Sequence, residues 1–459
     1  MKGSRIFAFR LACSLVTAAM GASMAMAMAL SAPHALHRTR SSESHLAVTH
    51  HASGHRSAAH AASAGRSSGV AAGSRRATAR TALAGREAKL APHGPATARA
   101  RRASFTTHRH RFYERFTASS FTNGDIFGGD VTAGEDPVVR RAAVDALGDM
   151  NGTAVVIDPS NGRILAMVNQ KLALSPGAEP CSTIKITVAM AALSEGLVNR
   201  DTMVQLPGFR MNMTQALAKS NNLYFEELGR ELGFERVRHY ANQFGLGELA
   251  GYNIEGEQLG VYPDKELSAA EGGVGRMCSF GQGVSLTPLQ LGAYVAALAN
   301  GGTLYYLQHP TNPQEVASFS PRIKRSLDIA KYVPEMQEGM AGAVEYGTAR
   351  RLSATFHDFP VFGKTGTCSD NGTRFGWFAS FSRSPQGNLV TVFFLEGGRP
   401  TFGPRAAELT GEFYKNLWDR NYFANKGQQE ARGAAQGTEM ERVIQQLPTA
   451  PGAAQPVPQ

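Results

Sequence analysis

The chain has 459 residues, and 42% of them are hydrophobic, which is enough for a sizeable core. The formal net charge of +10 is unevenly distributed, because residues 33–111 carry 14 Arg and Lys against two acidic residues, whereas the chain from Phe112 onward sums to about −5. A basic globular nucleic-acid-binding domain is therefore disfavoured.

The N-terminus has the pattern of an export signal. Lys2, Arg5 and Arg10 precede an uncharged run, residues 11–30, that is rich in Ala, Met and Leu and contains small-x-small cleavage sites such as Ala27-Met-Ala29. A run of about 20 such residues is also long enough to span a bilayer. Residues 1–32 are therefore predicted to be a signal peptide or a membrane anchor, and the rest of the chain is predicted to be exported.

Two segments have compositions that do not favour folding. Residues 33–111 consist mostly of Ala, Ser, His, Arg and Gly and hold 10 of the 13 histidines, without metal-ligand spacing. Such a segment cannot bury enough apolar surface to offset its ordering entropy, so a disordered basic tether is predicted rather than a metal site. Residues 426–459 are predicted to be a disordered tail. The folded domain is then predicted at 112–425.

Hydrophobic periodicity in the folded part predicts both strands and helices. The predicted strands are residues 153–157, 163–168, 361–367, 376–381 and 388–396. The predicted helices are residues 180–195, pieces of 211–245, 287–299 and 409–418. Strands, many helices, strands and a closing helix indicate an α/β fold of the α+β type: an antiparallel sheet flanked by helices, with an all-helical insertion between its halves.

Ser182-Thr-Ile-Lys185 stands at the start of a predicted helix, directly after Pro180. A spacing of three puts Ser182 and Lys185 on one helix face, and the helix start supplies free N–H groups and a positive field. A serine hydroxyl becomes a good nucleophile when a base takes its proton, and a lysine can do so if burial and a nearby cation lower its pKa. By itself, the motif is also compatible with a capping serine and a solvated lysine.

Ser220-Asn221-Asn222 interrupts a helical stretch, so its side chains are predicted to project from a loop. The hydroxyl of Ser220 could carry a proton to or from Lys185, and the Asn222 amide could orient Lys185 and hold a substrate carbonyl. The alternative is a helix cap, a role that Ser and Asn both fill well.

Lys364-Thr-Gly366 lies on a predicted strand. Lys364 supplies a second cation, Thr365 and Thr367 offer hydroxyls to a carboxylate, and Gly366 lets a substrate backbone approach the strand edge closely. The alternative is a plain strand followed by a turn.

Together and in this order, the three motifs resemble the signature of penicillin-binding proteins and serine β-lactamases. The segment 179–185 is similar to the family's Pro-Gly-Ser-Thr-Phe-Lys, with Cys181 in place of the usual Gly. Residues 280–290 and Ala299-Asn-Gly-Gly302 resemble the transpeptidase subgroup in particular. The resemblance covers about residues 150–420 and implies a β-lactamase/transpeptidase-like fold.

The resemblance also implies roles for these residues. Ser182 would attack a carbonyl and form an acyl-enzyme, Lys185 would be the general base, and Ser220 would relay a proton to the leaving amine. Backbone N–H groups of Ser182 and Thr367 would form the oxyanion hole. Lys364, Thr365 and Thr367 would hold the terminal carboxylate of the substrate.

The implied substrates are peptidoglycan stem peptides ending in D-Ala-D-Ala, with β-lactams as inhibitors and no metal or other cofactor. The implied location is the periplasm or cell envelope, on the outer side of the cytoplasmic membrane, with membrane contact through the N-terminal segment. Because no further large domain is recognisable, a partner protein of cell-wall synthesis is expected to help the domain reach its substrate.

A second Ser-x-Asn sequence and two cysteines lie next to the three motifs. Ser369-Asp370-Asn371 spells a variant of the second motif, but it follows Lys364 too closely to face it from the helical side, so Ser220 and Asn222 are preferred. Cys181 and Cys368 each adjoin a motif and are the first pair to test for a disulfide. Buried thiols at Cys181, Cys278 and Cys368 are the alternative.

Three other activities remain open from the sequence. A β-lactamase would use the same chemistry with fast deacylation, although no Ω-loop glutamate can be assigned. A D,D-carboxypeptidase would pass the acyl group to water. A non-catalytic β-lactam-sensing or scaffolding domain would be acylated once without turnover.

Overall fold

The computed structural model describes residues 115–428. They fall within one structural unit, Ser104–Gln459. The predicted signal or anchor segment 1–32, the tether 33–111 and nearly all of the tail 426–459 lie outside the described residues. Within the described part, no helix has both the length and the apolar character needed to cross a bilayer.

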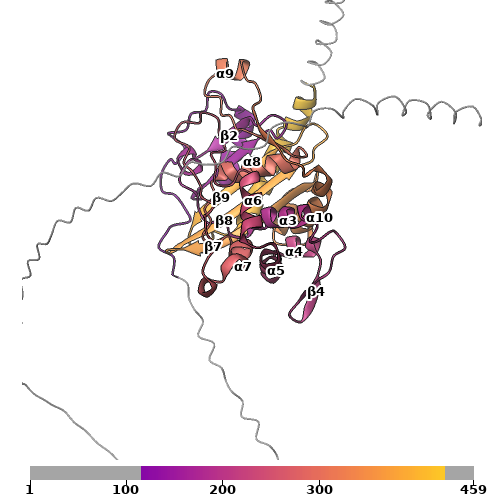
Figure 1. Cartoon of the computed structure of the whole chain (residues 1–459). Helices are drawn as coiled ribbons and strands as arrows, with labels where there is room; N and C mark the ends of the chain where they lie inside the picture. Colours follow the sequence, from indigo (N-terminus) through magenta and orange to yellow (C-terminus); the bar gives the residue numbers. More distant parts are fainter. Residues whose placement is uncertain (1–114, 429–459) are drawn as a thin grey trace, which may run out of the picture. The chain divides into compact units, whose positions relative to one another are not determined.

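A five-stranded antiparallel sheet organises this part of the chain (Figure 1), with the strand order β2-β1-β9-β8-β7. Its strands are β1 (Gly152–Ile157), β2 (Ile164–Val168), β7 (Val361–Asp370), β8 (Thr373–Ser382) and β9 (Val390–Gly397). Because β1 pairs with β9, the first and last strands of the domain join into one sheet, and β7 lies at its edge.

Side chains of the sheet alternate between two hydrophobic clusters. On β1, Val155 and Ile157 belong to one cluster, whereas Ala154 and Val156 belong to the other. The first cluster contains the apolar residues of α3 (Lys185–Ser194) and α8 (Pro288–Ala299), and the second contains those of α1 (Pro137–Leu147) and α12 (Gly403–Asp419). The sheet is therefore covered by helices on both faces, which explains why its central strands are apolar at nearly every position.

The remaining elements lie mostly between the two halves of the sheet in sequence. They are α2 (Gln170–Ala173), η1 (Cys181–Ile184), β3 (Val204–Leu206), β4 (Phe209–Met211), α4 (Met213–Lys219), α5 (Asn222–Leu232), α6 (Phe234–Gln243), η2 (Ala269–Glu271), α7 (Gly273–Phe280), β5 (Thr303–Tyr305), α9 (Pro313–Ala317), β6 (Ile323–Ser326), η3 (Ala330–Tyr332), α10 (Val333–Glu345) and α11 (Arg350–Thr355).

The predicted fold, an antiparallel sheet flanked by helices with a helical insertion, is confirmed. The insertion is not entirely helical, however, because β3–β4 and β5–β6 form two small antiparallel pairs within it. Strands of three or four residues are too short to show a clear two-residue period, so these strands could not be predicted from the sequence. Helical structure also extends over residues 422–428, a few residues past the predicted end of the domain.

Candidate active site

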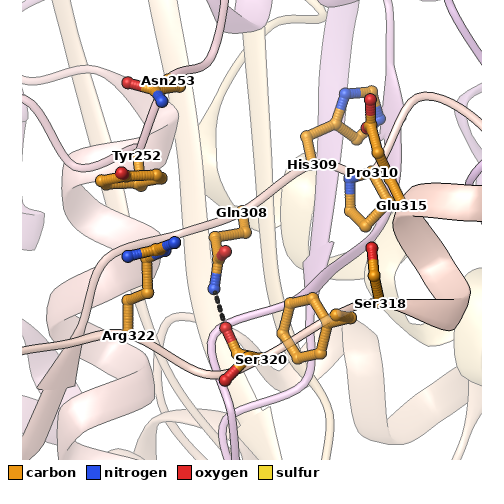
Figure 2. Close-up of a pocket in the computed structure, with 10 residues that line it drawn as sticks. Tyr252, Asn253, Gln308, His309, Pro310, Glu315, Ser318, Ser320 and Arg322 are labelled. Carbon is orange, nitrogen blue, oxygen red and sulfur yellow. Dashed lines mark hydrogen bonds between the residues drawn. The ribbon is translucent and has the colours of Figure 1, made fainter.

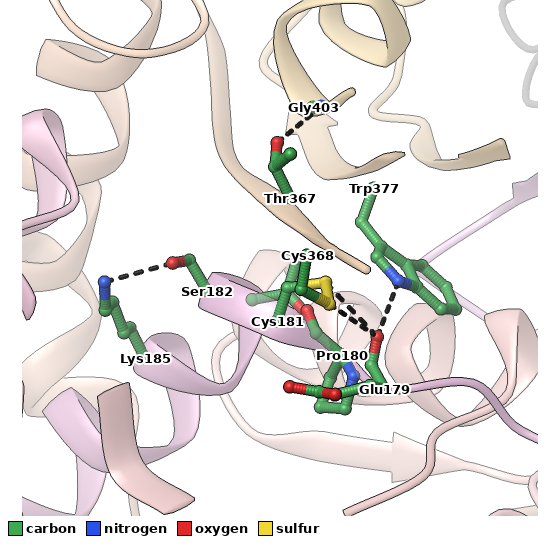
Figure 3. Close-up of a disulfide and its surroundings, with 10 residues drawn as sticks. Glu179, Pro180, Cys181, Ser182, Lys185, Thr367, Cys368, Trp377 and Gly403 are labelled. Atoms are coloured by element: carbon green, nitrogen blue, oxygen red, sulfur yellow. Dashed lines mark hydrogen bonds between the residues drawn. A yellow bond between two sulfur atoms is a disulfide. The ribbon is translucent and has the colours of Figure 1, made fainter. Parts of the chain in front are cut away.

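Ser182 lies in the short turn η1, and Lys185 begins helix α3 directly after it. The turn is shaped by Cys181, whose φ of +53° is in the left-handed region, and by the Thr183 hydroxyl, which donates to the Pro180 carbonyl at 2.7 Å. This geometry brings Lys185 Nζ to 3.0 Å from Ser182 Oγ (Figure 3).

Ser220 and Asn222 flank a break between two helices. Ser220 ends α4 in a left-handed conformation (φ +53°), and the Asn221 side chain caps α5 by accepting from the Tyr224 amide at 2.9 Å. The capping role thus belongs to Asn221, and its two neighbours contact Lys185 instead. Lys185 Nζ donates to Asn222 Oδ1 at 2.6 Å and lies 3.2 Å from Ser220 Oγ.

Lys364 reaches the same place from strand β7. Its ammonium donates to Ser220 Oγ at 2.8 Å and to the Thr365 carbonyl at 2.9 Å. The structure therefore joins five sequence-predicted residues through hydrogen bonds, and we call them the Ser182 cluster: Ser182, Lys185, Ser220, Asn222 and Lys364.

Both lysines of the Ser182 cluster are completely buried. Loss of hydration lowers the pKa of Lys185 well below its ordinary value, and the charge of Lys364 lowers it further, while Glu226 acts in the opposite direction. Burial lowers the pKa of Lys364 to about 7. A lysine that loses its proton this readily can take the proton of a neighbouring serine, so the arrangement can generate a nucleophile at Ser182.

The residues predicted to bind substrate lie along β7. Thr367 is exposed, and its hydroxyl accepts from the Gly403 amide at 2.8 Å. Thr365 is buried, with its hydroxyl 2.6 Å from that of Thr348. Thr348 was missed by the sequence analysis, because a contact between residues of two different elements leaves no local motif.

Gly366 is close to the protein's own chain. A Cβ there would lie 2.8 Å from the Pro180 carbonyl and 3.2 Å from Thr183 Cγ2. The absence of a side chain therefore allows β7 to pack against the turn that carries Ser182, a reason that the sequence analysis did not foresee.

Cys181 and Cys368 form a disulfide beside the nucleophile (Figure 3), which confirms the predicted pair. Cys278 is a buried free thiol. The neighbouring Trp377 indole donates to the Glu179 carbonyl at 2.9 Å. The disulfide thus joins the start of η1 covalently to β7, and the hydrogen bond joins the residue before Pro180 to the neighbouring strand β8.

The second Ser-x-Asn sequence belongs to a hairpin turn. Ser369 and Asp370 end β7, and Asn371 follows with a φ of +47° and donates to the Asp370 carboxylate at 3.0 Å. Its side chain serves the connection between β7 and β8, whereas Ser220 and Asn222 contact Lys185.

A separate hollow of about 280 Å³ has polar and aromatic walls (Figure 2). Arg322 stacks on Tyr252, with 4.0 Å between the guanidinium carbon and the ring centre, and Gln308 donates to the Ser320 carbonyl at 2.9 Å. None of the residues of the Ser182 cluster lines this hollow.

Comparison with known proteins gives the family. Residues 152–416, more than half of the chain, match the model of the penicillin-binding protein transpeptidase domain. The chain belongs to the penicillin-binding protein transpeptidase family. All five residues of the Ser182 cluster, together with Thr365, Gly366 and Thr367, lie within the matched region.

The chain is also similar to individual curated proteins. Stage V sporulation protein D of Bacillus subtilis is 31% identical over 316 residues, which cover 57% of this chain and 48% of that protein. Peptidoglycan D,D-transpeptidase MrdA of Acinetobacter baumannii is 26% identical over 359 residues, covering 61% of this chain and 53% of that protein. The chain thus spans about half the length of the curated relatives it matches.

A solved structure supports the fold. Penicillin-binding protein A from M. tuberculosis, solved as an imipenem acyl-enzyme complex, aligns with a TM-score of 0.52 over 61% of this chain and 78% of that one, at 22% identity. At this identity, the likeness establishes a shared architecture and nothing more about chemistry.

Proposed function

We propose that this chain is a serine D,D-transpeptidase that binds penicillin and cross-links peptidoglycan stem peptides through an acyl-enzyme on Ser182. The observation that carries the proposal is the 3.0 Å approach of Ser182 Oγ to the buried amine of Lys185. The family match and the names of the relatives support the same activity.

In the acylation step, Lys185 acts as the general base. Its neutral amine takes the proton of Ser182 as Ser182 Oγ bonds to the carbonyl carbon of the penultimate D-Ala. The backbone N–H groups of Ser182 and Thr367 stabilise the negative charge on the carbonyl oxygen. Asn222 holds Lys185 in place through its 2.6 Å hydrogen bond.

Breakdown of the tetrahedral intermediate requires a proton on the departing amine. Ser220 Oγ lies between Lys185 and Lys364, at 3.2 Å and 2.8 Å from their nitrogens, so it can relay a proton from the Lys185 side to the leaving terminal D-Ala. The C–N bond breaks, free D-Ala departs, and the acyl group stays on Ser182. An amine of a second stem peptide then takes the acyl group by the reverse proton transfers.

Strand β7 provides the binding edge. Because it is the outermost strand of the sheet, its free side can pair with an extended peptide, and this mode of binding suits a stem peptide. Lys364 contributes positive charge, and the hydroxyl of the exposed Thr367 is available to the terminal carboxylate of the substrate. Thr365 is buried against Thr348, and the hydrogen bond between their hydroxyls holds Thr365 in place beside Lys364 on this strand.

The cellular setting follows from the same proposal. With residues 1–32 as a signal peptide or membrane anchor, the domain acts on the outer side of the cytoplasmic membrane, in the periplasm or cell envelope, where stem peptides are found. Residues 33–111 would then tether the domain to the membrane or to cell-wall polymers, and a cell-wall synthesis partner would bring it to its substrate.

A fluorescent penicillin tests this function directly. We expect the purified full chain to be labelled on Ser182 and to keep the label for hours, and we expect Ser182→Ala to remain unlabelled. Ser194→Ala, which changes the serine at the far end of helix α3, is the matched control and should label normally. Labelling of Ser182→Ala would refute the nucleophile, and rapid loss of label from the wild type would favour a β-lactamase.

A second assay separates cross-linking from hydrolysis. A stem peptide ending in D-Ala-D-Ala, offered together with an amine acceptor, should give the cross-linked product. Release of D-Ala with only the hydrolysed peptide would identify a D,D-carboxypeptidase, and acylation without either product would identify a sensing or scaffolding domain.

A further inference from the structure

The disulfide joins the two chain segments that meet at the proposed oxyanion hole. Cys181 immediately precedes Ser182, and Cys368 immediately follows Thr367, although the two cysteines are 187 residues apart in sequence. The N–H groups of Ser182 and Thr367, which the proposed function assigns to the oxyanion hole, are thus each one residue from a cross-linked sulfur (Figure 3).

We propose that Cys181 and Cys368 are a positioning pair, and that their disulfide holds the Ser182 and Thr367 N–H groups at the spacing that acylation requires. The inference rests on the proposed function. It predicts that opening the disulfide slows acylation while penicillin binding and the fold are retained.

The conformation of Cys181 is the first argument. Its φ of +53° lies in a region that glycine enters freely and other L-residues enter at a cost of about 1 kcal/mol or more. Cys181 is also almost fully buried, at 1% exposure. A side chain in this place is unfavourable for the turn alone, and the cross-link to β7 gives it a purpose that a glycine could not serve.

The surrounding contacts are the second argument. Without the disulfide, the segment that carries Ser182 would still be connected to the sheet by the hydrogen bond from Trp377 on β8 to the Glu179 carbonyl and by the close packing of Gly366 on Pro180 and Thr183. These contacts preserve the overall arrangement, but they consist of one hydrogen bond and van der Waals packing, whereas the disulfide is the covalent link between the residues adjacent to Ser182 and Thr367. Loss of the cross-link should therefore loosen the oxyanion hole without unfolding the domain.

The expected fall in the acylation rate constant follows from the effects of changes at oxyanion holes. Complete loss of one oxyanion-hole donor lowers a rate by about 10²–10³-fold, and a misplacement of about 1 Å far from the chemistry can cost 10²-fold. A loosened pair of donors should give a smaller effect, so we expect the acylation rate constant to fall roughly tenfold or more.

The bond is open to a reductant from one side. Cys368 is partly exposed, whereas Cys181 is buried. One thiolate of dithiothreitol can attack Cys368 Sγ and release the Cys181 thiolate, which takes up a proton; the second thiol of the reagent then closes its own disulfide and frees Cys368. Two electrons and two protons pass from the reagent to the cystine. Burial raises the pKa of Cys278, so that residue remains an inert thiol.

The test compares the oxidised and reduced forms of the full chain carrying Cys278→Ala. In the described part of this variant, Cys181 and Cys368 are the remaining cysteines. Protein is reduced with dithiothreitol, freed of the reagent, assayed for thiols, and mixed with fluorescent penicillin over a range of concentrations. The fit separates the acylation rate constant from the binding constant. We expect the rate constant to fall on reduction, the binding constant to stay unchanged, and reoxidation to restore the rate.

Two variants distinguish the cross-link from the turn. Cys368→Ser removes the disulfide and should be slow before and after dithiothreitol. Cys181→Gly also removes it but supplies the residue that fits the positive φ, and it should be slow as well. If Cys181→Gly acylates as fast as oxidised wild type, the conformation of the turn rather than the cross-link sets the rate, and the inference is wrong.

The remaining outcomes are equally decisive. Equal acylation rates in oxidised and reduced protein would overturn the inference and leave the proposed function standing. No labelling even in the oxidised protein would overturn both. If Cys368→Ser fails to fold, as judged by its melting temperature, the reduced wild type still gives the answer, because it is compared with itself after reoxidation.

Discussion

Positively charged side chains have different partners in two regions of this domain. In the Ser182 cluster, Lys185 and Lys364 are fully buried, and their hydrogen bonds go to hydroxyl, amide and carbonyl oxygens. Arg140 on α1, in contrast, donates to Asp130 at 2.8 Å and to Glu135 at 2.9 Å. We call this second group, with His309 bound to Glu135 at 2.9 Å, the Arg140 cluster.

The pKa values of the two regions shift in opposite directions. Burial lowers the pKa of both lysines, and the charge of Lys364 lowers the pKa of Lys185 further. For Arg140, desolvation is outweighed by the hydrogen bonds and charges of Asp130 and Glu135, so its pKa rises. The paired arginine is therefore fixed in its charged form and can only stabilise structure, whereas the unpaired lysines can exchange protons.

The largest expected effect comes from removing the amine of Lys185. Lys185→Met should lower the acylation rate by about 10³-fold, because general-base catalysis contributes 10²–10⁴-fold. Its melting temperature should stay equal to or above that of the wild type, since Lys185 forms no ion pair within the described part of the chain and an apolar side chain of similar length can fill the same buried site. Fluorescent penicillin labelling and thermal unfolding measure the two quantities.

Two results for Lys185→Met would contradict a catalytic role for this lysine. A Lys185→Met protein that labels normally, or one that is strongly destabilised, would mean that the lysine serves the fold rather than the chemistry.

The next effect concerns stability. Arg140→Met should lower the free energy of unfolding by about 3 kcal/mol, because it removes the arginine that pairs with the buried carboxylates of Asp130 and Glu135. The folded fraction should still be acylated at the wild-type rate. Urea unfolding gives the first value, and labelling per folded molecule gives the second.

Arg141→Met is the matched control for that experiment. Arg141 lies one residue along the same helix and pairs with Asp145 at the surface, where an ion pair is worth less than about 1 kcal/mol. If both variants lose equal stability, pairing of Arg140 with the two buried carboxylates contributes no more than a surface ion pair.

The sequence predicted the Ser182 cluster better than it predicted the Arg140 cluster. Ser182 and Lys185 share a local spacing, and the helix break at 220–222 and the apolar strand at Lys364 are local signals, so their motifs can be found one by one. That they meet was an expectation from the family resemblance. Arg140, Asp130 and His309 come from separate segments without a motif, so their association depends on tertiary packing that no sequence period encodes.

The same reasoning explains what the sequence missed in the fold. Strands with both faces buried are long and apolar, so β1, β8 and β9 could be predicted. Helix α10 and the short strands β3 to β6 have mixed burial and weak periodicity, and they went unassigned. Tertiary contacts decide such elements more than local preference does.

The smallest expected effect concerns the influence of a nearby carboxylate on the pKa of Lys185. Glu226 raises the pKa of Lys185 through its charge, against the desolvation and the Lys364 charge that lower it. In Glu226→Gln the pKa of Lys185 should therefore fall further, and the amine should stay neutral down to lower pH. The acidic limb of the acylation rate against pH should move to lower pH by a fraction of a unit, and added salt should reduce the shift.

Glu227→Gln provides a closely matched control for this shift. Arg230 is paired with both carboxylates, with Glu226 at 3.1 Å and Glu227 at 2.5 Å, so each variant leaves it one partner. Of the two carboxylates, the charge of Glu226 is the one that acts on Lys185. Only Glu226→Gln should therefore move the acidic limb; an equal shift in both variants, or a shift toward higher pH, would show that Lys185 is not the base whose titration sets that limb.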